Sequence, residues 1–321
     1  MSRTRLRGRV CCEGGALVEA ASVGRPAGGV TERAREERRL GWILCAPAVI
    51  AMLLVTAYPI CYAIALSLQN LDLRFPDETG WAGLTNYQTV LTSSLWWQDV
   101  LNTVIITVFS VALELTLGML IALVMYRAIF GRGAVRAAVL IPYGIVTVAA
   151  AFAWQFAFSP GTGFVDPALG IDKAWFGGHI SSLAVIIMAE VWKTTPFMAL
   201  LLLAGLTTID NGLYEAAKVD GANAMQRFFR ITLPLMKPAI LVALLFRTLD
   251  AFRIFDNIFI MTRGAQNTES VSILGYNQII SRTNLGLGSA VSVLIFISVL
   301  LIAFAFVRVL GVRMAEGRPG A

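Results

Sequence analysis

Six charged residues lie inside long hydrophobic stretches of the sequence, where charge is costly. They are Glu114, Glu190, Lys193, Arg247, Asp250 and Arg253. A charge at the centre of a membrane-spanning helix costs about 2.5–3.5 kcal/mol, so such residues are expected to face a partner or water. Glu190–Lys193, Arg247–Asp250 and Asp250–Arg253 are each three positions apart, so each pair can neutralise itself on one helix face. Two roles stay open for them, namely locking helices together or lining a path for a polar solute.

No enzyme active site emerges from the other reactive residues. His179 is the only histidine, which leaves no plausible catalytic triad and no histidine-based metal site. No Gly-Lys dipeptide occurs, so the phosphate-binding loop G-x-x-x-x-G-K-[ST] is absent. Cys45 and Cys61 lie on one predicted helix, about 24 Å apart along its axis, too far for a disulfide. We therefore expect this chain to be non-catalytic and to bind no cofactor.

The composition indicates a membrane protein. Of 321 residues, 57% are hydrophobic and 14% are charged, against about 45–50% and about 25% in soluble domains. Six stretches are long enough to cross about 30 Å of hydrocarbon as helices: 41–68, 100–125, 134–158, 181–206, 239–262 and 288–310. We predict an all-α fold in which residues 41–312 form a six-helix domain. Residues 1–40 would be a disordered basic arm and no cleavable signal peptide, and residues 313–321 a short tail.

The distribution of basic residues predicts the orientation. Nineteen of the 26 Lys and Arg lie in the arm, from Arg308 to the C-terminus, around 127–136 and in the loop 207–238, whereas four lie in the loops on the other side. Excess Lys and Arg stays in the cytoplasm, so both termini and the loop 207–238 should be cytoplasmic, in a multi-pass protein of the cell membrane. The net charge of +6 does not indicate nucleic-acid binding, because the basic residues flank apolar segments.

The loop 207–238 contains an ordered motif. Residues 213–219 are good helix formers, and Asp220-Gly221 interrupts them. A second short helix is expected over 222–230, ending before Pro234. Two short helices at a sharp turn would project a rigid knob from the membrane, and small alanines on it would let another surface approach closely.

The same loop carries a family resemblance. It matches in full the EAA loop of permease subunits of bacterial ABC importers. The matching pattern is Glu215-Ala-Ala, three residues, Gly221, nine residues, and Ile231-x-Leu233-Pro234. Sugar permeases of the maltose type are similar over nearly the whole chain after the arm, at Ala46-Pro47, Tyr58-Pro59, Gly83-Leu-Thr-Asn-Tyr87, Leu140-Ile-Pro-Tyr143 and Trp192-Lys-Thr-Thr-Pro-Phe197. Residues 239–257 especially resemble the trehalose-importer permeases of mycobacteria.

The resemblance implies the type I ABC importer permease fold and a set of partners. A second homologous permease subunit would complete the sugar path, and two copies of an ATPase subunit would bind ATP and Mg. An extracytoplasmic lipoprotein would deliver the sugar, implied to be trehalose. The loop would dock on the ATPase, with Asp220, Arg230 and Pro234 holding its turn. The implied coupling residues are Glu215, Ala216, Ala217, Asp220, Gly221, Ala222, Arg230, Ile231, Leu233 and Pro234.

The resemblance also implies a substrate path. In the maltose-type permease the sugar contacts come from the spans before and after the loop. Carried over by spacing, they fall on Thr194, Phe197, Asp250 and Arg253. Carboxylate, guanidinium and aromatic groups suit a sugar. This chain departs from the maltose permease in having charged groups where that protein has amides.

Three alternatives remain. The solute could be glycerol phosphate or another oligosaccharide, although three cations and three anions within the spans favour a neutral solute. An ion-driven secondary transporter would show inverted repeats, which are not evident in six spans. A structural membrane subunit without transport does not explain the EAA loop.

Overall fold

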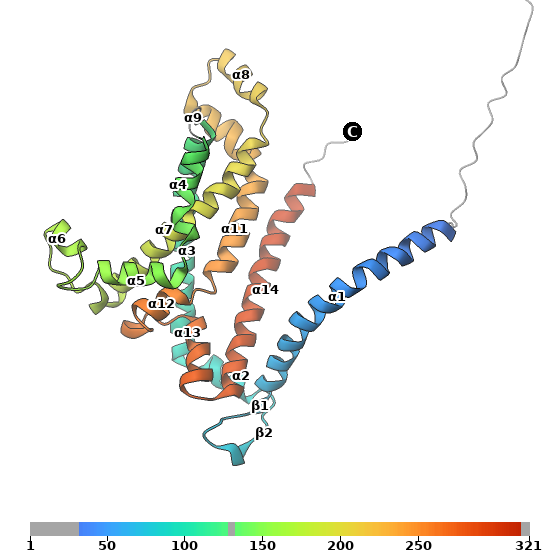
Figure 1. The fold of residues 1–321 in the computed structure, drawn as a ribbon, viewed down its shortest axis with the longest axis vertical. Helices are drawn as coiled ribbons and strands as arrows, with labels where there is room; N and C mark the ends of the chain where they lie inside the picture. The colour runs from blue at the N-terminus through green and yellow to red at the C-terminus, as the bar shows by residue number, and fades with distance from the viewer. Residues whose placement is uncertain (1–31, 128–131, 316–321) are drawn as a thin grey trace, which may run out of the picture. The chain divides into compact units, whose positions relative to one another are not determined.

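The computed structural model describes residues 32–127 and 132–315, and their backbone is mostly helical (Figure 1). It divides into two units, residues 1–57 and 58–321. Helix α1 (Glu32–Ser67) runs through the boundary between them. Residues 32–40 of the predicted arm belong to helix α1, and residues 1–31 of the arm lie outside the described residues. Of the predicted tail, residues 313–315 continue a helix and 316–321 lie outside.

Four helices of the described chain are long and apolar enough to cross a membrane. They contain the segments Arg39–Ser67, Ser94–Arg127, His179–Thr207 and Leu285–Arg308. These belong to α1, α3 (Ser94–Arg127), α7 (His179–Thr207) and α14 (Leu285–Ala315). They correspond to the first, second, fourth and sixth predicted spans.

The third and fifth predicted spans are each divided into two helices in the structure. Helix α4 (Arg132–Gly144) contains Pro142 and is followed by α5 (Thr147–Ala157) after a bend of 83°. Helix α11 (Lys237–Ala251) begins after a 67° bend from the preceding helical segment, and a four-residue break separates it from α12 (Asp256–Met261). If each bent pair is one span, the total rises to six. Proline and glycine in α4 explain the first break, because proline removes a donor and glycine lowers helix propensity.

Within the second unit, several of the short elements lie at two opposite ends (Figure 1). Helices α8 (Asn211–Val219) and α9 (Ala224–Arg227) lie at one end. Helix α2 (Thr85–Thr92) and the antiparallel hairpin of β1 (Gln69–Asn70) and β2 (Gly80–Trp81) lie at the other, with Gln69 opposite Trp81. The remaining elements are α6 (Val165–Leu169), α10 (Leu233–Leu235), α13 (Val271–Tyr276), and helical turns at Pro76–Glu78, Trp175–Gly177, Phe228–Thr232, Ala265–Asn267 and Asn277–Ser281.

Side-chain contacts join the hairpin end to the start of α14. Asn284 Nδ2 donates to Asp72 Oδ2 (3.2 Å), and the Leu73 N–H donates to the Thr283 carbonyl (3.0 Å). Arg74 donates to both carboxylate oxygens of Asp72 and lowers the pKa of that carboxyl to about 2.

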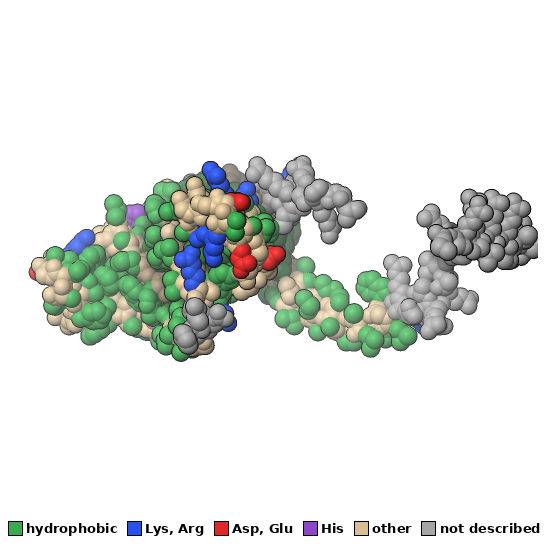
Figure 2. Space-filling model, turned by 90° about the horizontal axis from the view of Figure 1, so that it is seen from above, with side chains coloured by type: hydrophobic (Ala, Val, Ile, Leu, Met, Phe, Trp, Pro, Cys, Tyr) green, Lys and Arg blue, Asp and Glu red, His purple; other side chains and the backbone are tan. Residues whose placement is uncertain are grey.

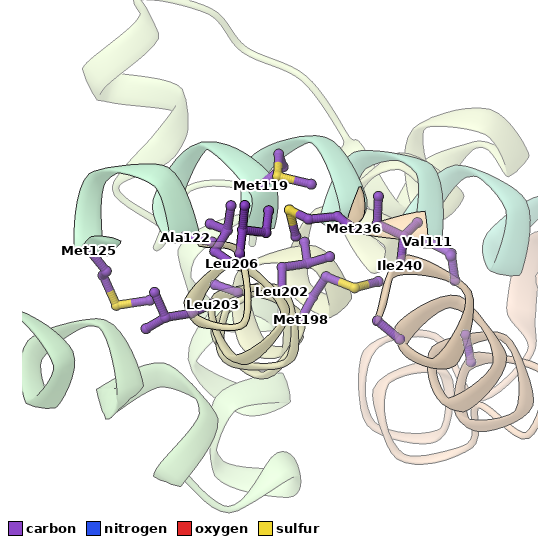
Figure 3. Close-up of a cluster of buried hydrophobic side chains, with 14 residues drawn as sticks. Val111, Met119, Ala122, Met125, Met198, Leu202, Leu203, Leu206, Met236 and Ile240 are labelled. Atoms are coloured by element: carbon purple, nitrogen blue, oxygen red, sulfur yellow. The ribbon is translucent and has the colours of Figure 1, made fainter. Parts of the chain in front are cut away.

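The core of the second unit is built on close packing of α3 against α7 (Figure 3). Met119 and Ala122 of α3 lie against Met198 and Leu202 of α7, and Met236 packs beside them. Gly118 permits this approach, because a Cβ there would lie 2.8 Å from the Met198 Cγ and 3.2 Å from the Ala199 nitrogen. The helices that flank the loop 207–238 are therefore anchored in one tightly packed core.

Candidate functional site

A buried arginine joins three helices inside the second unit. Arg247 of α11 is 1% exposed. Its Nε donates to Glu114 Oε2 of α3 (2.6 Å), and its Nη2 donates to Glu114 Oε1 (2.7 Å) and to Glu190 Oε1 of α7 (3.1 Å). Its Nη1 donates to Asp250 one turn further along α11. One guanidinium thus links three carboxylates, and such a bidentate pair is among the stronger protein contacts.

Two uncharged side chains complete this cluster. Thr194 Oγ1 lies 2.7 Å from Glu114 Oε1 and 2.6 Å from the Glu190 carbonyl oxygen, and its hydroxyl can donate to either. Asn257 Nδ2 of α12 donates to Glu190 Oε2 (2.6 Å). Buried charges need partners for their remaining lone pairs, and these two groups supply them. The arginine cluster therefore ties α3, α7, α11 and α12 together.

Of the three local ion pairs that the spacing predicted, one is present and two are not among the described residues. Arg247 and Asp250 form the expected ion pair along α11. Glu190 instead pairs with Arg247 and Asn257, while Lys193 Nζ donates to the Ile145 carbonyl (2.9 Å) and lies 5.8 Å from the centre of the Tyr143 ring. That carbonyl lies in the break between α4 and α5, so the lysine satisfies an acceptor that the helix leaves free. No ion pair of Arg253 with Asp250 is present in the described part of the chain.

A cleft of about 440 Å³ opens beside this cluster. Glu190, Lys193, Thr194, Asp250 and Arg253 line it. The other polar and aromatic lining residues lie beside the two helix breaks. They are Tyr143 and Thr147 at the first break, and Phe255, Asp256 and Asn257 at the second. Ligand clefts of about 300–1,000 Å³ with a few convergent polar groups suit small organic ligands. The cleft offers carboxylates, cations, hydroxyls and aromatic faces to such a ligand.

Three of the four predicted path residues meet in this cleft. Thr194 is buried, while the Asp250 side chain is 67% exposed and Arg253 is exposed. Phe197 is not part of the lining, but its ring stacks on Tyr143 at 5.3 Å and 12° and so supports the wall of the cleft. Tyr143, Thr147, Phe255 and Asn257 were not predicted as site residues. For Tyr143 and Thr147 the signal in the sequence was the interruption of an apolar stretch by Pro142 and Gly144, whereas no proline or glycine marks the break beside Phe255 and Asn257.

The loop 207–238 folds as two short helices at a sharp turn, as predicted. Helix α8 begins at an N-cap, Asp210, whose carboxylate accepts from the Gly212 N–H (2.9 Å). At its end the Ala222 N–H donates to the Ala217 carbonyl (2.9 Å) and the Gly221 N–H to the Lys218 carbonyl (3.1 Å). These two bonds, with Gly221 at φ +77°, are the Schellman arrangement that glycine favours.

The second half of the loop differs from the prediction. Helix α9 starts with a capping box in which Asn223 and Gln226 exchange backbone to side-chain bonds of 2.8 and 2.9 Å. The helical backbone then passes through a π-helical segment, Phe228–Thr232, into α10, so it does not stop before Pro234. The wider π turn shifts the hydrogen-bond pattern just before Pro234, where an α-helix would be disrupted.

Contacts in the turn come from residues other than those expected. Arg227 Nη1 donates to the Ala222 carbonyl (3.1 Å), and the Tyr214 hydroxyl lies 3.0 Å from Thr232 Oγ1. Among the described contacts, the side chains of Asp220 and Arg230 make no hydrogen bond in the turn, so their role there stays a prediction. Figure 2 views the molecule from this end, where Lys, Arg, Asp and Glu side chains gather. Apolar side chains are exposed there too, including Val219 at 88% and Met225 at 65%.

Comparison with known families gives a match over most of the second unit. The family described as binding-protein-dependent transport system inner membrane component matches residues 114–316. The chain is 54% identical over 283 residues to the trehalose transport system permease protein SugA of Mycobacterium tuberculosis, covering 88% of this chain and 92% of that protein. It is 39% identical over 279 residues to the trehalose/maltose transport system permease protein MalF of Thermococcus litoralis, covering 85% and 94%.

A solved structure shares the fold. A chain in the crystal structure of a bacterial ABC transporter involved in the import of the acidic polysaccharide alginate superimposes with a TM-score of 0.74. The match covers 86% of this chain and 98% of that chain, at 24% identity. The chain therefore shares its fold with a chain of a bacterial ABC transporter.

Proposed function

This chain belongs to the family of binding-protein-dependent transport system inner membrane components, and we propose that it is a permease subunit of an ATP-driven sugar importer. It would form half of the translocation path and couple to a separate ATPase. Membership of a transport family and the absence of a phosphate-binding loop both support a subunit that is not itself an enzyme. In this proposal each bent helix pair is one span, so the domain has six, with both termini in the cytoplasm.

The observation that carries the sugar proposal is the cleft beside Arg247. Within and around it there are four acidic side chains (Glu114, Glu190, Asp250 and Asp256) and three cations (Lys193, Arg247 and Arg253), so it carries no excess of cations that would select a phosphorylated or acidic solute. Tyr143 and Phe255 give aromatic faces for a sugar ring, and the exposed Asp250 and Arg253 can exchange hydrogen bonds with hydroxyls. The relatives named for trehalose and for trehalose/maltose support a disaccharide, and we propose trehalose.

The loop around Gly221 is proposed as the contact with the ATPase. Its helix α8 is capped at both ends and holds exposed apolar and charged residues, including Leu213, Glu215 and Val219. An exposed apolar surface on a rigid helix suits a partner that covers it. Two helices flanking the loop, α7 and α11, carry Glu190 and Arg247, so a movement of the loop would reach the cleft through the arginine cluster.

The remaining partners follow from this assignment. A second homologous permease would form the other half of the path, two ATPase copies would hold ATP and Mg, and a sugar-binding lipoprotein would deliver the solute from outside. Glycerol phosphate would suit this cleft less well, because Glu190, Asp250 and Asp256 also line it and their carboxylates would repel a phosphate group.

Uptake of labelled trehalose tests the proposal. In a host that lacks this chain, expression of the full transporter should restore uptake, and unlabelled trehalose should compete better than glycerol phosphate or a longer oligosaccharide. If uptake of glycerol phosphate were restored and trehalose did not compete with it, the solute would be glycerol phosphate and not trehalose. No ATP-dependent uptake of any sugar would overturn the assignment as a sugar permease.

A further inference from the structure

A second cleft, of about 500 Å³, lies between α8 and the ends of the long helices. Two hydrogen bonds hold its walls: Tyr126 Oη of α3 donates to Asn211 Oδ1 of α8 (3.0 Å), and Tyr214 of α8 lies within hydrogen-bond distance of Thr232. Tyr214 and Lys218 are four residues apart on α8 and both line the cleft. Residues on the other side of α8, such as Glu215 and Val219, do not. The cleft is therefore behind the helix surface proposed to meet the ATPase.

The lining of this cleft has one sign of charge. Arg127 at the end of α3, Lys218 of α8 and Arg227 of α9 all line it, and no aspartate or glutamate among the described residues does. Arg136 of α4 lines an adjoining cleft of about 320 Å³ that shares Tyr126 and Asn211 with the first. Arg227 gives one N–H to the Ala222 carbonyl, which leaves other donors of its guanidinium for a ligand. Concave surfaces lined by like charges concentrate counter-ions, so an anion is the ligand that fits.

The floor of the cleft is apolar and belongs to membrane-spanning helices. Leu123 of α3 and Leu206 of α7 form part of it, together with Phe228. Helix α3 ends at Arg127, so the cleft lies where apolar helix surface gives way to polar groups. The distribution of Lys and Arg assigns this end to the cytoplasm, and basic pockets between helices at that side of a membrane suit anionic lipid headgroups.

We infer that the basic cleft behind α8 binds the phosphate headgroup of an anionic phospholipid. Arg127 and Lys218 contact the phosphate, Tyr126 and Asn211 lie within reach of headgroup oxygens, and Leu123 meets the apolar part of the lipid. The inference rests on the proposed function only for the membrane and its orientation. A lipid bound there would brace α8 against α3 from behind.

Lipid retention by the purified full-length chain tests this inference without using transport as a readout. The probes are phosphatidylglycerol, phosphatidylcholine and inorganic phosphate, and retention is followed by native mass spectrometry in detergent. Two contacts are removed together in Arg127→Gln with Lys218→Gln, and Lys237→Gln is the matched control, because Lys237 is a cation of the same loop outside the cleft. We expect the double variant to bind phosphatidylglycerol about 30-fold more weakly, or about 2 kcal/mol at about 1.4 kcal/mol per tenfold.

The control should retain phosphatidylglycerol like the wild type, and phosphatidylcholine should be retained weakly by all three proteins. Equal retention of phosphatidylglycerol by the wild type and the double variant would overturn the site. Displacement of the lipid by millimolar inorganic phosphate, with tight binding of phosphate itself, would assign the cleft to a soluble phosphate and overturn the lipid. Equal thermal midpoints of the three proteins in phosphatidylcholine show that a loss of binding is not a loss of folding.

Discussion

Replacing Arg247 by methionine should lower the free energy of unfolding of this chain strongly, although Arg247 lies outside the proposed coupling loop. Arg247 gives Glu114 hydrogen bonds of 2.6 and 2.7 Å and gives Glu190 one of 3.1 Å, in a place where Glu114 is 0% exposed. Removing one partner of a buried ion pair costs about 3–5 kcal/mol, because the other charge stays buried without compensation. Here two carboxylates lose the same partner, so we expect a loss at the upper end of that range.

The assay is the apparent free energy of unfolding of the purified chain in a titration from mild detergent into sodium dodecyl sulfate. Arg253→Met is the matched control, since Arg253 is exposed and makes no ion pair in the described chain; it should cost less than about 1 kcal/mol. Adding Glu114→Gln and Glu190→Gln to Arg247→Met removes the stranded charges and should recover at least half of the loss. Equal effects of the two methionine variants, or no recovery in the triple variant, would refute the reasoning.

Two further predictions concern orientation and coupling. In a variant without the native cysteines, a cysteine at Asp77 should react with an impermeant thiol reagent in intact cells and one at Asn223 should not; labelling of Asn223 would reverse the orientation. Gly221→Val places a β-branched residue at φ +77°, which costs about 1–2 kcal/mol locally and distorts the end of α8. We expect the variant to reach the membrane at normal levels, measured by immunoblot, with uptake reduced at least tenfold; wild-type uptake would exclude the loop from coupling.

Hydropathy and motif spacing predicted much of the fold because their physical basis is local. Apolar stretches of about 20 residues are dictated by bilayer thickness, and the helices around Gly221 are dictated by caps and glycine geometry. The four long spanning helices and both loop helices were predicted. The sequence did not predict how sharp the bends of 83° and 67° are, because a proline or glycine in an apolar stretch is compatible with a slight kink and with a sharp bend.

The charge cluster shows why the site was harder to predict than the fold. Spacing of three residues predicted Glu190 with Lys193, a rule that holds on helix surfaces where only neighbours compete. In the buried cluster Arg247 pairs with Glu114, which is 133 residues away in the chain, and it also donates a hydrogen bond to Glu190. Lys193, which has no carboxylate partner among the described residues, donates a hydrogen bond to the Ile145 carbonyl in the break between α4 and α5. Partner choice there depends on tertiary packing that no local spacing encodes.

The cleft residues depend on the same breaks. Tyr143 and Phe255 line the cleft only because the helices are interrupted beside them. Thr194, Asp250 and Arg253 were predicted from their distance to the loop motif, and they do meet at one cleft. Phe197 does not line the cleft and supports its wall through Tyr143, so its role in the sugar path stays a prediction.

The amount of trehalose transported per ATP hydrolysed tests the central claim most directly. The measurement uses the transporter, with its partners, in proteoliposomes that carry the double variant Asp250→Asn with Arg253→Gln. This change removes both exposed charges of the cleft and keeps their shapes, and it leaves Arg247 with Glu114 and Glu190. If the cleft lines the sugar path, trehalose transported per ATP should fall at least tenfold while ATP hydrolysis stimulated by the loaded binding protein persists. An unchanged ratio of trehalose to ATP would contradict the account and leave these residues a role in helix packing alone.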